Sequence, residues 1–169
     1  MQYVSLGGIT VGLCILGYYL TTWYPGRKAL MKDPARHAAG LAPFLFAWAY
    51  GCLTILGIGG IIGWTARTAL WITSWLGDVA LVWGVGTSAG QHAGGTVYLP
   101  LTETGGAIVL ILTVVMVALV KKSRHGRDIK LGAWCGICLG TSAGIAGFAA
   151  VPLAQAVNWL GGTVYGAVA

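Results

Sequence analysis

Two cysteines with a spacing used in redox chemistry lie in the C-terminal half of the chain, as Cys135-Gly136-Ile137-Cys138. Such a pair works in a thiol oxidoreductase when one thiol is held as a thiolate and a second cysteine pair exchanges electrons with it. The remaining cysteines, Cys14 and Cys52, stand singly in apolar sequence. We therefore interpret the cysteines of this motif as small apolar side chains packed within a helix, with a membrane thiol oxidoreductase as an alternative.

Charged residues that could form a site are few. Asp78 stands alone in apolar sequence, where we expect it to cap the start of a second short helix or, with Arg67, to contact an ion or a partner. His92 has no neighbours at the spacing of a zinc site. The sequence contains no nucleotide-binding loop, no serine-nucleophile motif and no carboxylates paired in reach of each other. It therefore predicts no catalytic residue, no cofactor and no metal, and we expect that the protein is not an enzyme.

The composition indicates that lipid surrounds much of the chain. Hydrophobic residues make up 57% of the 169 residues and charged residues 8%, and the mean hydropathy is +0.79. A soluble domain carries about 25% charged residues, because its surface faces water. The first three residues, Met-Gln-Tyr, lack the basic start of a cleaved secretory signal, so we expect the first apolar segment to be retained as a helix. The chain is predicted to form a single membrane domain, residues 1–169.

Four apolar segments are long enough to cross a bilayer, which takes about 20 residues per helix. The predicted spans are residues 4–24, 38–64, 103–120 and 131–151. Their cores contain none of the ionisable residues that ion-coupled transporters and voltage sensors place there. Pro152 is expected to kink or end the fourth helix. The sequence thus predicts an all-α integral membrane protein with four transmembrane helices.

Basic residues gather in two short segments, 25–37 and 121–130, which hold every Lys and Arg except Arg67. Short basic loops stay on the cytoplasmic side of a membrane. With four spans both segments fall on that side, which places both termini outside the cell membrane. This distribution accounts for the net charge of +6 without a nucleic-acid partner.

An outer segment, residues 65–102, joins the second and third spans. Within it, residues 68–86 are apolar enough for a fifth span, but a fifth crossing would put the two basic loops on opposite sides. We therefore predict an outer interfacial or re-entrant helix, whose Trp71, Trp75 and Trp83 suit the level of the lipid headgroups.

Four glycines recur at every fourth position in the fourth predicted span: Gly132, Gly136, Gly140 and Gly144. Residues with this spacing share one helix face, where glycines let another backbone approach closely. We interpret this face as a helix-packing interface. The spacing favours packing within the chain, with self-association between copies as the alternative.

Three segments resemble small multi-span membrane proteins encoded by actinobacterial phages and integrative elements. They are residues 76–86 (LGDVALVWGVG), 101–106 and 140–154 (GTSAGIAGFAAVPLA). The similarity covers the C-terminal half. It implies the membrane of an actinobacterial host and a mobile-element gene as the setting, and it carries over no functional residue.

These features favour a non-enzymatic membrane scaffold or accessory subunit, in this setting one that serves DNA transfer or the contact of a phage with the host membrane. The expected partners are the lipid bilayer and either further copies in a homo-oligomer or another membrane protein, associating through the Gly-rich fourth helix. A pore-forming or holin-like protein is the main alternative, although no span shows the polar stripe that lines a pore.

Overall fold

The computed structural model describes residues 4–24, 31, 34–56, 60–86, 92–93, 102–140 and 145–168. In these ranges the chain is helical apart from a few residues at helix ends and turns and one short antiparallel pairing, in which β1 (Val4–Ser5) lies beside β2 (His92–Ala93). The helices are α1 (Leu6–Trp23), α3 (Pro34–Leu56), α4 (Gly60–Val85), α5 (Glu103–Lys122), α6 (Gly126–Leu139) and α7 (Ile145–Val168). The all-α fold class is therefore confirmed.

Three of the described helical segments are long and apolar enough to cross a membrane: Leu6–Trp23, His37–Leu56 and Thr104–Lys122. The surface of α5 fits this role, because Leu110, Ile111 and Val114 are 56%, 62% and 62% exposed. A continuous apolar face of this kind is typical of a helix that faces lipid or another protein. The fold is compatible with a membrane-associated protein.

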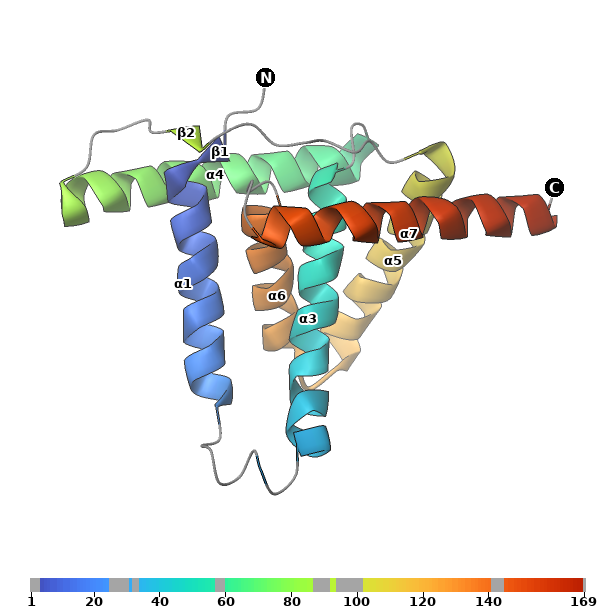
Figure 1. Ribbon diagram of the computed structural model, residues 1–169, viewed down its shortest axis with the longest axis horizontal. Coiled ribbons are helices and arrows are strands. Elements are labelled where there is room, and N and C mark those ends of the chain that lie inside the picture. The colour runs from blue at the N-terminus through green and yellow to red at the C-terminus, as the bar shows by residue number, and fades with distance from the viewer. Residues whose placement is uncertain are drawn as a thin grey trace.

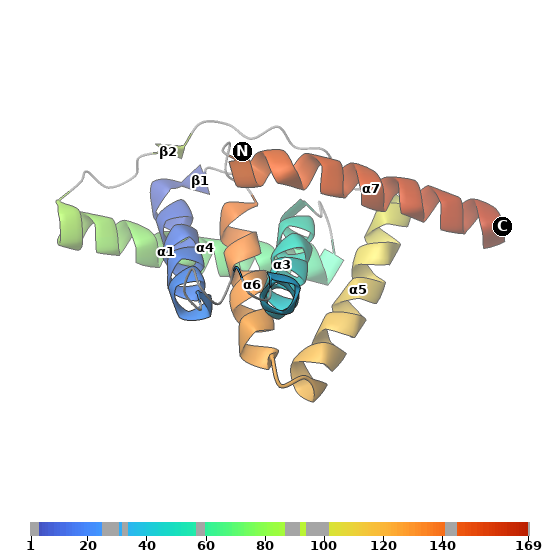
Figure 2. The ribbon, with the colours of Figure 1, turned by 60° about the horizontal axis from the view of Figure 1, so that its bottom comes forward.

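Four helices form a bundle, and the other two lie across one of its ends (Figure 1). α1, α3, α5 and α6 run along the bundle, and α6 lies between α1 and α3 (Figure 2). α4 and α7 cross the end where α1 and α5 begin, and they overhang it in opposite directions. We call this the crossed end, defined by Leu6, Leu56, Glu103 and Leu139. The opposite, basic end is defined by Trp23, Pro34, Lys122 and Gly126.

The predicted second span, 38–64, is divided between two helices. α3 ends at Leu56 and α4 begins at Gly60, which has a φ of +78°. Glycine adopts this left-handed conformation readily, and a residue in this conformation interrupts a helix. α4 then continues without a break to Val85, so the apolar part of the predicted outer segment lies in one helix across the bundle end (Figure 1).

The predicted fourth span, 131–151, also consists of two helices. α6 ends at Leu139 with Gly140 as its C-cap, and α7 begins at Ile145. The 14 residues of α6 rise about 21 Å, which is short of the roughly 30 Å of a bilayer core. Weak helix formers (Gly, Thr, Ser) occupy residues 140–142. Pro152, where a kink or end was expected, lies inside α7.

The two predicted basic loops are shorter than expected where the structure describes them. α5 extends to Lys122 and α6 begins at Gly126, so helix covers most of residues 121–130. α3 begins at Pro34, inside the segment 25–37. The rest of that segment, apart from Met31, lies outside the described residues.

The core of the bundle lies where α3 and α6 meet. The largest fully buried side chains are Phe44, Cys52, Cys135 and Cys138. The ring of Tyr19 on α1 stacks on Phe44 of α3, with 3.9 Å between centroids and 9° between planes. At the crossed end a cluster of Cys52, Ile55, Leu56, Ala66, Leu70 and Ala154 joins α3 to both crossing helices. The crossing helices are therefore part of the packed fold.

Candidate functional site

Three of the four regularly spaced glycines face the backbone of α3. The contacts are Gly132 with Phe44, Gly136 with Trp48 and Gly140 with Cys52. A Cβ atom at any of these positions would come within 3.0 Å of backbone atoms of α3, so this approach depends on glycine. This face of α6 is thus covered within the chain. Gly144 lies outside the described residues.

The cysteines of the CxxC motif lie in the same packed region. Cys135 and Cys138 are fully buried, and the Sγ of Cys135 donates to the Gly12 carbonyl of α1 over 3.4 Å. Cys52 is also buried, and its Sγ donates to the Gly136 carbonyl over 3.5 Å. A thiol oxidoreductase needs a thiol that a second disulfide can reach. Here all three thiols are enclosed by packed helices, and the S–H groups of Cys135 and Cys52 end on backbone carbonyls.

Asp78 lies in the middle of α4 and serves a different helix. Its Oδ1 accepts a hydrogen bond from the backbone N–H of Gly7, in the first turn of α1, over 3.2 Å. Gly77 lies directly against the backbone of Gly7, which brings the two helices close enough for this contact. The expectation that Asp78 starts a second short helix was wrong, because α4 runs through it. Asp78 instead caps α1 from outside.

Arg67, the candidate partner of Asp78, lies about three turns earlier on the same face of α4. At about 1.5 Å per residue the two are about 16 Å apart along the helix, which is too far for an ion pair. The Nε of Arg67 donates to the Gly63 carbonyl of its own helix over 3.1 Å. The structure therefore places Asp78 against α1, whereas Arg67 bonds to a carbonyl of its own helix, α4.

α7 makes a matching contact with the start of α5. The Oδ1 of Asn158 accepts from the backbone N–H and from the hydroxyl of Thr102, each over 3.1 Å. Thr102 is itself the N-cap of α5, and its Oγ1 accepts from the N–H of Gly105. Gly161 of α7 lies against the backbone of Thr104. Both crossing helices thus attach to the first turn of a bundle helix through a polar acceptor beside a glycine.

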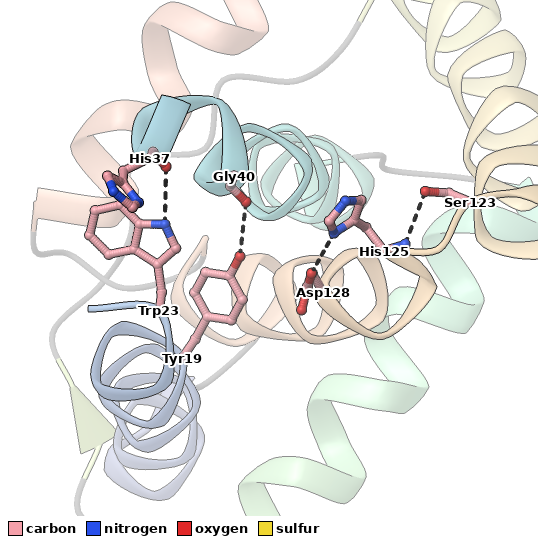
Figure 3. Close-up of polar contacts among 7 residues, drawn as sticks. All are labelled: Tyr19, Trp23, His37, Gly40, Ser123, His125 and Asp128. Atoms are coloured by element: carbon pink, nitrogen blue, oxygen red, sulfur yellow. Dashed lines mark hydrogen bonds and ion pairs between the residues drawn. The ribbon is translucent and has the colours of Figure 1, made fainter. Parts of the chain in front are cut away.

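A pocket of about 380 Å³ opens at the basic end, between α1, α3 and α6. Its lining residues are Tyr18, Tyr19, Thr22, Trp23, Gly40, His125, Arg127, Asp128 and Leu131. Hydrogen bonds to α3 hold two aromatic walls in place (Figure 3): Tyr19 donates to the Gly40 carbonyl over 3.5 Å, and Trp23 donates to the His37 carbonyl over 3.1 Å. The pocket therefore has fixed aromatic sides.

Charged side chains from the start of α6 complete the pocket. The Nδ1 of His125 and the Oδ2 of Asp128 are hydrogen-bonded over 3.1 Å (Figure 3), and the backbone N–H of His125 donates to the Ser123 hydroxyl. Arg127 reaches across to α1, where it donates to the hydroxyl of Tyr18 over 2.8 Å. The arrangement presents a cation, a carboxylate and aromatic rings around one opening, a combination that suits the binding of a polar group.

Sequence reasoning missed this pocket, because it assigned the basic segments to membrane topology alone. A usable signal was present: Arg127, Leu131 and Trp134 recur at the spacing of one helix face, and aromatic residues crowd the end of α1. The sequence alone does not show that α1 and α6 are neighbours.

In the described part of the chain, no group of three or more His, Cys, Asp or Glu side chains is placed to hold a metal ion. His92 lies in β2, opposite Ser5. Comparison of the chain with protein families, curated proteins and solved structures gave no match.

Proposed function

We propose that the chain is a non-enzymatic integral membrane protein that acts as a scaffold or accessory subunit of a membrane complex. The crossing helices are the observation that carries this proposal, because they overhang the bundle in opposite directions (Figure 1). Their overhanging parts expose large apolar side chains, with Trp83 on α4 88% exposed and Tyr165 on α7 65% exposed. Apolar surface of this extent is normally covered by lipid or by another protein.

In this proposal α1, α3, α5 and α6 cross the membrane, the basic end faces the cytoplasm and both termini lie outside. The cations at the turn between α5 and α6 favour that orientation: Lys121, Lys122, Arg124, Arg127 and Lys130. α6 is shorter than the other three, but it packs against α1, α3 and α5. A helix enclosed by others does not have to match the bilayer thickness with its own surface.

α4 lies along the outer membrane interface in this arrangement. Its small and polar residues Gly77 and Asp78 face the bundle, whereas Trp64, Trp71 and Trp75 are 66%, 71% and 60% exposed. A helix on a water-exposed surface shows the reverse pattern. Indole rings are favourable at the headgroup level, where one edge is wet and the rest is apolar.

The overhangs, residues 79–85 of α4 and 162–167 of α7, are the proposed contact surface. They take this role in place of the Gly-rich face of α6, because α3 covers that face within the chain. The partner is a second copy of the chain or another membrane protein. The mobile-element setting, which rests on the resemblance of three segments, would make that partner a component of the same element.

Site-specific photo-crosslinking in the host membrane tests the proposal. A photoreactive residue would replace Trp83, Tyr165 or Ile111, the last being a control on α5 that is exposed to nearly the same extent as Tyr165. We expect protein adducts from positions 83 and 165 and lipid adducts alone from position 111. Lipid adducts alone from all three positions would refute a scaffold that associates through its crossing helices.

A further inference from the structure

Arg127 supplies the fixed positive charge of the pocket at the basic end. One of its five N–H donors goes to the Tyr18 hydroxyl over 2.8 Å, and its guanidinium lies 5.9 Å from the centre of the Tyr18 ring. Within the described residues, its other donors have no partner and remain available to a ligand. Arg prefers to bind phosphate or carboxylate with two parallel hydrogen bonds.

The pocket also contains hydrogen-bond acceptors. Asp128 uses Oδ2 to bind His125 over 3.1 Å, which leaves its Oδ1 for another donor. The hydroxyl of Thr22 donates to backbone carbonyls of its own helix, so its lone pairs can accept. An Arg next to two acceptors matches an anionic group that carries hydroxyls beside it.

The surroundings favour a negatively charged ligand although Asp128 lines the pocket. Arg127 lines the same pocket, and four exposed cations lie at the same end of the bundle: Lys121, Lys122, Arg124 and Lys130. A cleft surrounded by one sign of charge concentrates ligands of the other sign.

An apolar track leads from the pocket along the bundle. Arg127, Leu131 and Trp134 lie one above the other on α6, at the spacing of a single helix face. Leu131 lines the pocket, and Trp134 is 42% exposed. A ligand with an acyl chain attached to its anionic group would lay that chain along this track, toward the middle of the bundle.

We propose that this pocket binds the phosphodiester of an anionic phospholipid with a hydroxylated headgroup, of which phosphatidylglycerol is the simplest example. Arg127 and the Tyr18 hydroxyl hold the phosphate, Asp128 and Thr22 accept from the headgroup hydroxyls, and the acyl chain contacts Leu131 and Trp134. Basic pockets between transmembrane helices bind acidic headgroups in this way. The site does not depend on whether the chain associates through its crossing helices.

Binding can be measured with the full chain purified in a neutral detergent. Short-chain phosphatidylglycerol, short-chain phosphatidylcholine and inorganic phosphate would be titrated separately, with the shift of the unfolding temperature as the readout. The variants are Arg127→Gln, Tyr18→Phe and Arg124→Gln. The last removes the same charge from the same end, but from a residue that does not line the pocket.

We expect phosphatidylglycerol to bind most tightly, and Arg127→Gln to weaken it at least about tenfold, because a charge-assisted pair of hydrogen bonds is lost. Tyr18→Phe should weaken it by a few-fold and Arg124→Gln by less than about twofold. Equal losses in Arg127→Gln and Arg124→Gln would mean unspecific attraction to the basic end and would overturn the site.

A second readout tells whether the pocket binds the phosphate of a lipid headgroup or free inorganic phosphate. Phosphatidylglycerol with brominated acyl chains should quench tryptophan fluorescence, and Trp134→Phe should remove a measurable part of that quenching, the remainder coming from the other exposed tryptophans. If inorganic phosphate displaces the lipid at equal concentration, or if Trp134→Phe leaves the quenching unchanged, the assignment to a lipid headgroup is wrong.

Discussion

The carboxylate of Asp78, in the middle of α4, accepts a hydrogen bond from the backbone N–H of Gly7, in the first turn of α1, over 3.2 Å. The first N–H groups of a helix have no partner within the helix, and the helix dipole makes that end positive. An anion from a crossing helix therefore stabilises the start of α1 and also fixes where α4 crosses it.

Replacing Asp78 by Ala is expected to destabilise the fold by about 1–2 kcal/mol, because the cap and its charge are both lost. Asp78→Asn keeps an acceptor and should lose about half as much. The measurement is unfolding by denaturing detergent, followed by circular dichroism. Thr65→Ala is the control, since the Thr65 hydroxyl is exposed and bonds within its own helix. Equal stability of Asp78→Ala and Thr65→Ala would show that the cap contributes nothing.

Gly136→Ala is expected to destabilise the chain by about 1–3 kcal/mol through overpacking. Its Cβ would overlap the backbone of Trp48, which cannot move without shifting α3. Gly17→Ala in α1 is the matched control, because open space surrounds that position, and it should be neutral or stabilising by up to about 1 kcal/mol. The free energy of unfolding of both variants is measured with the same assay. A similar loss of stability in Gly136→Ala and Gly17→Ala would argue against close packing of α6 on α3.

Asn158 is expected to hold α7 on α5 through its side-chain carbonyl oxygen, which accepts, and not through its NH2 group. Asn158→Asp should therefore keep the contact with Thr102, whereas Asn158→Leu should lose it. Hydrogen exchange at the backbone amides of residues 102–106 is the measurement. We expect exchange about tenfold faster or more in the Leu variant, as the loss of one or two hydrogen bonds implies. Unchanged exchange in Asn158→Leu would contradict this role.

The proposed topology is tested by thiol labelling in intact cells, with the four native cysteines replaced by serine. A single cysteine at Thr163 should react with an impermeant reagent, and one at Ser123 should react only after the membrane is opened, because the two lie at opposite ends of the bundle. A cysteine at Ile111 should stay unlabelled in lipid. Labelling at position 123 in intact cells would show that the orientation is opposite to the proposed one.

The sequence predicted the helical class and the apolar segments, because hydrophobic run length and loop charge are local properties. The positions at which helices end within the predicted second and fourth spans were predicted less accurately. Residues 57–60 (GIGG) carried a signal for a break within the segment 38–64, but glycine alone does not interrupt a membrane helix. The break after Leu139 lies thirteen positions before Pro152, the residue expected to cause it.

The functional residues were harder to predict for a different reason. The role of Asp78 depends on Gly7, and the pocket depends on α1 and α6 being neighbours, and neither pairing leaves a local pattern. The glycines of α6 were recognised because their spacing is itself the signal. Which partner they face, α3 of the same chain, is a property of the packed bundle.

The two contacts at the crossed end also order the events of biosynthesis. They join residues 71 and 56 positions apart, so on the ribosome α1 and α5 are complete well before Asp78 and Asn158 have been added. Until then, the backbone N–H groups of Gly7 and Thr102 must donate to water. α4 supplies the acceptor for the first of these groups, and α7 supplies the acceptor for the second. Formation of α1 and α5 and closure of their starts are thus separate steps, and both contacts are in place only after α7 has been made.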